Sequence, residues 1–60
     1  MIKLTLKSSD NHYIYINTFQ IVCFYSDKSN GSIIEMTRGE NIQVTETPEE
    51  IQKLIEKELI

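Results

Sequence analysis

The sequence predicts an α+β domain in which a five-stranded antiparallel meander sheet carries one C-terminal helix packed on one face. Apolar and polar residues alternate with the two-residue period of strands along most of the first 45 residues. Turn-forming residues separate these stretches, most clearly the pair Asn30 and Gly31. The end of the chain instead repeats apolar residues every three to four positions, which is typical of an amphipathic helix.

The helix is the element that the sequence marks most clearly. Thr47 is a suitable N-cap, and Pro48 suits the first helical position, where a missing N–H costs nothing. Glu50 lies three residues after Thr47 and completes a capping box. The apolar stripe consists of Ile51, Leu54, Ile55 and Leu59. An isolated helix of this length would be marginal in water, so we expect the stripe to pack against the sheet.

The first two strands are predicted at residues 2–6 and 12–16, joined as a hairpin through a polar turn at residues 8–11. Residues 17–20 follow as a corner, because Asn17 and Thr18 can bond to their own backbone. We expect Phe19 to pack beneath this corner.

The third strand, predicted at residues 20–26, is apolar on both faces, so we expect it to be central or buried on both sides. A turn at residues 27–31 leads to a fourth strand at 32–37. Gly39 then reverses the chain in the left-handed region before a fifth strand at 42–45. A one-residue slip in the third strand would exchange its two faces. The predicted core comprises Ile2, Leu4, Leu6, Ile14, Ile16, Ile21, Cys23, Ile34, Met36, Ile42, Val44, Ile51, Leu54 and Ile55.

Length and composition limit the classes of protein that fit. Sixty residues make a single domain, residues 1–60, whose small core favours self-association as a source of stability. Cys23 is the only cysteine and His12 the only histidine, which excludes an intrachain disulfide and a zinc cluster within one chain. We therefore expect no metal and no cofactor. Cys23 has no basic neighbour to activate it, and no serine or carboxylate suggests a triad with His12, so we expect no enzyme.

The charge and hydropathy patterns bear on partners and location. A net charge of −3 weighs against nucleic acid, because phosphate binding depends on clustered Lys and Arg. Lys3 and Lys7 interrupt the opening apolar residues, so we expect no signal peptide. No apolar run approaches the ~20 residues that span a bilayer. These features favour a soluble, cytoplasmic protein without membrane insertion.

One face of the predicted sheet is too apolar to face water. The helix can cover only one face, and the other carries Tyr13, Tyr15, Val22, Phe24 and Ile33. Such patches usually mark interaction surfaces, and we expect a homo-oligomer interface here. Two alternatives are a sheet that curls into a small barrel, which would bury these residues internally, and a different protein partner. Lys3 and Lys7 beside the two tyrosines also match, more weakly, a single-stranded nucleic-acid surface.

Four stretches resemble a known family: the opening residues 1–5, the strand end at 14–17, the hairpin at 33–40 and the helix start at 44–51. Together they are similar to the FlbD/SwrD-type small proteins associated with flagellar and swarming motility. This resemblance implies a small bacterial protein with a motility-associated or unknown role. The order of elements also resembles, more weakly, the LytTR DNA-binding domain and the carbon-storage-regulator RNA-binding dimer, although their basic loops and basic edge are missing here. The sequence therefore favours a non-enzymatic, homo-oligomeric interaction module, with a nucleic-acid-binding regulator as the alternative.

Overall fold

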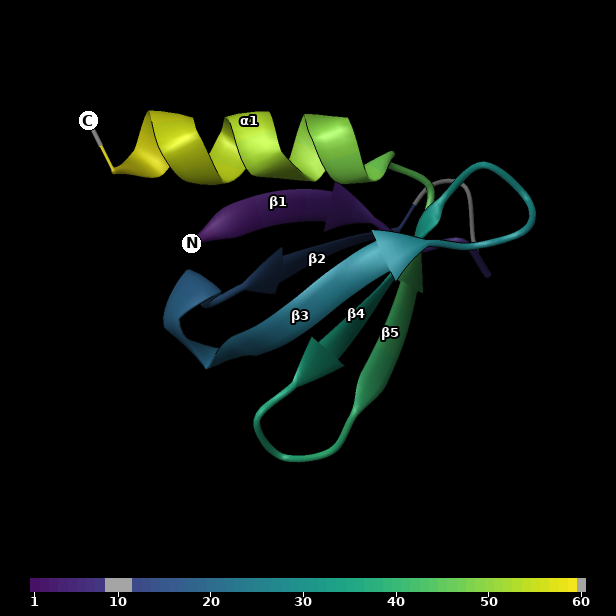
Figure 1. Ribbon diagram of the computed structural model, residues 1–60, viewed down its shortest axis with the longest axis horizontal. Helices are drawn as coiled ribbons and strands as arrows, with labels where there is room; N and C mark the ends of the chain where they lie inside the picture. The colour runs from purple at the N-terminus through teal and green to yellow at the C-terminus, as the bar shows by residue number, and fades with distance from the viewer. Residues whose placement is uncertain (9–11, 60) are drawn as a thin grey trace.

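The computed structural model describes residues 1–8 and 12–59 (Figure 1). Most of the predicted turn at residues 8–11 lies outside the described residues. The elements follow in the order β1 (Ile2–Thr5), β2 (Tyr13–Ile16), the 3₁₀ turn η1 (Thr18–Gln20), β3 (Ile21–Ser26), β4 (Ser32–Met36), β5 (Asn41–Val44) and α1 (Pro48–Glu58). The α+β class and the C-terminal helix are confirmed.

The prediction of a single five-stranded meander was wrong. Strands β1 and β2 form one antiparallel sheet, and β3, β4 and β5 form a second. The break falls at η1, where the Asn17 side chain accepts a hydrogen bond from the Phe19 N–H over 3.1 Å. This tight corner, together with the strong twist of short strands, separates β2 from β3 instead of letting them pair.

The two sheets are joined at the end of β1 instead. Leu6 and Val44 form an isolated antiparallel bridge. On either side of it, the Thr45 N–H donates to the Thr5 carbonyl over 3.0 Å, and the Lys7 N–H donates to the Gln43 carbonyl over 3.1 Å. The first strand is therefore tied to the last, and the sheets enclose a space between them.

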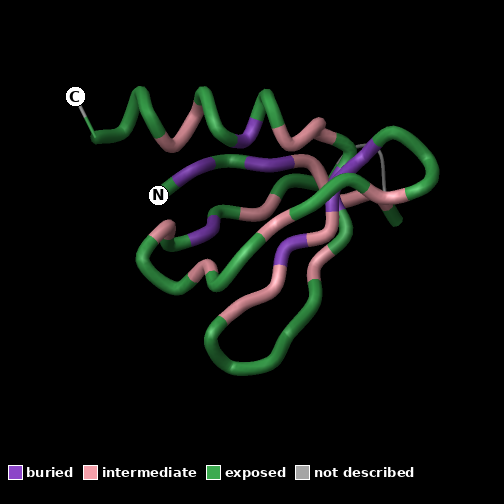
Figure 2. The backbone as a smooth tube through the Cα atoms, viewed as in Figure 1, coloured by how far each residue is buried: buried purple, intermediate pink, exposed green. Residues whose placement is uncertain are grey.

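Apolar side chains fill this space and form the core. The buried hydrophobic residues are Ile2, Leu4, Ile16, Ile34, Val44 and Ile51. Figure 2 shows buried stretches on both sheets and on α1. All six belong to the predicted core. Of the other predicted core residues, Ile14, Ile21, Met36, Ile42, Leu54 and Ile55 are partly buried against the cluster, and Leu6 is half-buried.

Cys23 was wrongly predicted to be a core residue, since it is exposed. A β-bulge causes the difference. Ile21 pairs with Met36, but Cys23 pairs with Glu35, so β3 holds one extra residue between these two pairs. Beyond the bulge the faces are exchanged. Phe24, expected on the outer face, therefore packs against the core cluster.

Two other apolar residues lie outside the core. Phe19 is 84% exposed rather than packed beneath the corner, because η1 holds it on the outside of the turn. Leu59, the last member of the predicted helix stripe, is 71% exposed, because it caps the end of α1. The stripe that contacts the core is thus shorter than the sequence pattern suggested.

Helix α1 contacts β1 of one sheet and β3 of the other, so it covers the opening between them (Figure 1). Its N-terminus has the predicted capping box: the Glu50 N–H donates to Thr47 Oγ1 over 3.2 Å, and the Thr47 N–H donates to Glu50 Oε1 over 3.0 Å. At its other end, the N-terminal ammonium of Met1 pairs with Glu58. Ile51, which has no exposed surface, is the helix residue that enters the core.

Candidate interaction surface

The outer face of β1 and β2 carries two exposed tyrosines. Tyr13 lies opposite Thr5, and Tyr15 lies opposite Lys3, all with side chains on the face away from the core. Tyr13 is 56% exposed and Tyr15 is 63% exposed. We call these four residues, Lys3, Thr5, Tyr13 and Tyr15, the tyrosine face.

Lys3 is positioned on this face by an aromatic ring. Its ammonium nitrogen lies 4.2 Å from the centroid of the Tyr13 ring, within the range of a cation–π contact. At an exposed site such a contact is worth about 0.5–1 kcal/mol. The lysine stem and the two rings together form an amphipathic surface of the kind enriched at protein interfaces.

The structure does not gather the five predicted interface residues on one face. Tyr13 and Tyr15 lie together on the two-stranded sheet. Val22 is 62% exposed, but it belongs to β3 in the other sheet, where Ile33 is half-buried on β4. Phe24 packs against the core cluster, because the bulge exchanges the two faces of β3. The set divides because the predicted single sheet is two sheets.

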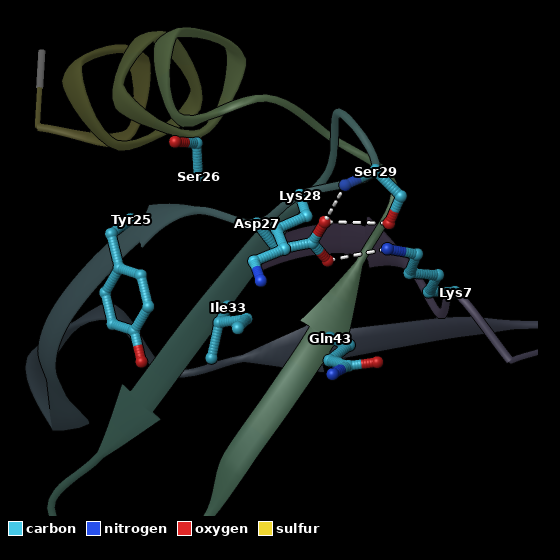
Figure 3. A pocket seen from close by; sticks show the side chains of 8 residues that line it. All are labelled: Lys7, Tyr25, Ser26, Asp27, Lys28, Ser29, Ile33 and Gln43. Atoms are coloured by element: carbon cyan, nitrogen blue, oxygen red, sulfur yellow. Dashed lines mark hydrogen bonds and ion pairs between the residues drawn. The ribbon is translucent and has the colours of Figure 1, made fainter.

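Lys7, which the sequence grouped with Lys3 and the tyrosines, lies in a different environment. Its ammonium donates to Asp27 Oδ2 over 2.6 Å. The Asp27 Oδ1 atom accepts hydrogen bonds from Ser29, from the N–H over 2.5 Å and from the hydroxyl over 2.8 Å (Figure 3). The Asp27 side chain is only 8% exposed. Hydrogen bonds from Lys7 and Ser29 lower the pKa of Asp27 to about 2.

This ion pair closes one side of an open hollow of ≈ 460 Å³. Its lining residues, shown in Figure 3, are Lys7, Tyr25, Ser26, Asp27, Lys28, Ser29, Ile33 and Gln43. Both Asp27 carboxylate oxygens accept hydrogen bonds from Lys7 or Ser29, and these bonds fix the loop between β3 and β4. The arrangement therefore holds the loop between β3 and β4 against the end of β1.

Cys23 and Tyr25 lie near Glu35 on the outer face of β3 and β4. The Tyr25 hydroxyl donates to Glu35 Oε2 over 3.0 Å, and this hydrogen bond raises the pKa of Tyr25. Desolvation by neighbouring atoms and the Glu35 carboxylate raise the pKa of Cys23. A raised pKa leaves less thiolate at neutral pH, which is the opposite of what a nucleophilic cysteine needs.

Glu46 and Ser32 are structural residues that the sequence did not reveal. The Glu46 carboxylate accepts from the Thr5 N–H over 2.9 and 3.1 Å and from the Thr5 hydroxyl over 2.9 Å. Ser32, which is fully buried, donates its hydroxyl to the Glu46 carbonyl over 2.7 Å. These bonds join β1, β4 and the start of α1. No local sequence pattern signals them, because the partners are far apart along the chain.

Within residues 1–8 and 12–59, no three His, Cys, Asp or Glu side chains lie close enough to hold a metal ion. In the same part of the chain, no helix has the length and apolar character to cross a membrane. His12 is exposed, and its carbonyl accepts the Leu6 N–H over 2.9 Å.

The described residues form a small α+β protein with two antiparallel sheets, a covering helix and two exposed tyrosines side by side on the outer face of β2. No family model, curated protein or solved structure matches the chain.

Proposed function

We propose that this chain is a small, non-enzymatic interaction module that self-associates through the tyrosine face. The supporting observation is the pair Tyr13 and Tyr15, each more than half exposed and two residues apart on one face of a two-stranded sheet. Burying an aromatic ring that keeps its hydroxyl at the rim is favourable in an interface. A chain of 60 residues also has few buried side chains and gains stability from association.

A matched pair of substitutions tests this proposal. Tyr15 and Val22 are 63% and 62% exposed, but they lie on different sheets. We expect Tyr15→Glu to reduce the solution mass, measured by light scattering, to that of a monomer, because the carboxylate would lose water against the aromatic side chains of the second copy. Val22→Glu should leave the mass unchanged. If the wild-type protein is monomeric at all concentrations, the proposal is wrong.

The structure gives less support to a nucleic-acid partner. The sequence suggested a nucleic-acid surface because Lys3 and Lys7 accompany the tyrosines. In the structure Lys7 forms an ion pair with Asp27, and only Lys3 lies on the tyrosine face. Binding to phosphates requires several cations on one surface. We therefore expect no gel shift of single-stranded DNA or RNA even at low salt, and a shift that weakens with added salt would favour the regulator instead.

We further propose that the protein is cytoplasmic and has a role in motility. The resemblance of its sequence to FlbD/SwrD-type proteins supports the motility role. Deleting the gene in its host and comparing swarming on soft agar tests this role. Complementation with the Tyr15→Glu variant, beside Val22→Glu as the control, would show whether the tyrosine face is needed. Normal swarming in the deletion strain would exclude a motility role without bearing on self-association.

A further inference from the structure

The backbone hydrogen-bond pattern shows which groups of β2 point away from β1. The Leu6 N–H donates to the His12 carbonyl, and the pairs that follow are Leu4 with Ile14 and Ile2 with Ile16. In an antiparallel ladder, bonded and non-bonded pairs alternate. The N–H and C=O groups of Ile14 therefore face β1, whereas those of Tyr13 and Tyr15 face the open edge of the sheet.

Within the described part of the chain, no backbone hydrogen bond is made at this edge. Strand β2 pairs with β1 alone. Of the other outer strands, β3 pairs with β4 alone but contacts helix α1, and β5 is bonded to β1 through Thr45 and Gln43. The residues of β2 are Tyr-Ile-Tyr-Ile, with no charge and no proline. Proteins usually protect an exposed edge with charge, proline or a covering element, because an unprotected edge pairs readily with another strand.

We propose, building on the proposed function, that the partner at this edge is a second copy of the chain, whose β2 pairs antiparallel with β2 about a two-fold axis at Ile14. In this register Tyr13 of each copy pairs with Tyr15 of the other through about four backbone hydrogen bonds. The result is a continuous sheet in which all four tyrosines lie on one face. The interface is isologous, as closed dimers require.

Three features of the chain favour a second copy over an unrelated peptide. The outward groups of Tyr13 and Tyr15 are placed symmetrically about Ile14, so the edge is complementary to itself. Ile14 is only half-buried and packs against the core, so contact with its equivalent extends the core across the axis. The strand also carries no charge that would oppose its own copy.

The nearest like charges do not oppose this arrangement. Lys3 lies on β1, and its equivalent in the second copy would be three strand spacings away, about 14 Å. This exceeds the Debye length of about 8 Å at physiological ionic strength. Repulsion between the two lysines is therefore largely screened. None of the acidic residues that give the chain its net charge of −3 belongs to β2.

Amide hydrogen exchange of the wild-type protein tests the register directly. In a monomer the N–H groups of Tyr13 and Tyr15 face solvent and exchange quickly. In the proposed dimer they are bonded, so their exchange should slow by about tenfold or more as concentration rises. Ile14 and Ile16, which bond to β1 in either state, serve as internal controls. Unchanged exchange at Tyr13 and Tyr15 in a protein of dimeric mass would overturn the register while leaving self-association intact.

Two variants provide a second test. Tyr15→Pro removes an outward N–H without removing a bond to β1, and edge strands tolerate proline at such positions. Tyr15→Thr keeps the N–H and favours strand structure, but it removes the ring. We expect Tyr15→Pro to be monomeric, and Tyr15→Thr to dimerise more weakly than wild type. A dimeric Tyr15→Pro would exclude pairing at this edge, and a wild-type monomer would contradict both this inference and the proposed function.

Discussion

At the scale of single residues, the two glycines are required for different reasons. A Cβ added to Gly31 would lie 2.2 Å from the Val44 carbonyl oxygen, a backbone atom held by the pairing of β4 and β5. Gly39 has open space around it but a φ of +88°. We expect Gly31→Ala to lower the free energy of unfolding by about 1–3 kcal/mol or more, and Gly39→Ala by about 1 kcal/mol.

Asparagine separates these two causes. It tolerates a left-handed backbone better than alanine, so Gly39→Asn should recover part of the loss seen in Gly39→Ala. Gly31→Asn should be at least as damaging as Gly31→Ala, because the clash is with its Cβ. Urea denaturation of the four variants measures both comparisons, and equal losses at the two positions would contradict the assignment.

The ion pair between Lys7 and Asp27 predicts a dependence of stability on pH. The folded pKa of Asp27, about 2, lies below its value in an unfolded chain, near 3.9. The carboxylate therefore stabilises the fold above pH ~4, and this contribution is lost as pH falls towards 2. We expect Asp27→Asn to be less stable than wild type at pH 6, with the difference shrinking at pH ~2.5.

Lys7→Met is the matched variant, because it keeps the apolar stem but removes the charge. Its effect should overlap with that of Asp27→Asn, so the double variant should lose less than the sum of the two single losses. A difference between Asp27→Asn and wild type that stays constant with pH would show that the charge of Asp27 does not stabilise the loop.

Neither this pair nor the contact between Glu46 and Thr5 could be predicted from the sequence. Their partners are 20 and 41 residues apart, and no spacing rule connects them. Glu46 could be placed before the helix, but not on the backbone of β1. Tyr13 and Tyr15 could be placed on an outer face, because the period of a strand assigns alternate side chains to opposite sides.

At the scale of elements, the cap of α1 was predictable because all of its parts are local: Thr47, Pro48 and Glu50 lie within four residues. We expect Thr47→Ala to lower the free energy of unfolding by about 1 kcal/mol, since the Glu50 N–H loses its acceptor. Thr47→Ser keeps the hydroxyl and should change stability little. Thermal unfolding of both variants tests this, and equal stability would mean that the side-chain cap contributes nothing.

The elements that the sequence misassigned depend on contacts between distant parts of the chain. The sequence from Ile21 to Phe24 does not reveal the bulge in β3. Both faces of that strand are apolar, so the two-residue period does not show which face points towards the core. The bridge between Leu6 and Val44 depends on how far the sheets twist, which local propensity does not determine. The strands themselves were found, but their grouping into two sheets was not.

At the scale of the whole molecule, Ile51 joins the three parts of the fold. It has no exposed surface and lies on the helix that contacts both sheets. We expect Ile51→Ala to cost about 2–5 kcal/mol, which is comparable to the whole stability of about 3–5 kcal/mol that a core of this size supplies. The variant should therefore be largely unfolded, with weakened far-ultraviolet circular dichroism. Leu59→Ala, at a position 71% exposed, is the control and should change stability by at most about 0.5 kcal/mol.

The same variant connects stability with self-association. A partner that binds only the folded chain stabilises it by mass action, so raising the concentration of Ile51→Ala should restore part of its folded signal. Adding Tyr15→Pro to Ile51→Ala should abolish this recovery, because the pairing edge is then blocked while the core defect is the same. A wild-type unfolding midpoint in Ile51→Ala would mean that the helix contributes little to the core. Recovery that survives Tyr15→Pro would mean that the chains associate through another surface.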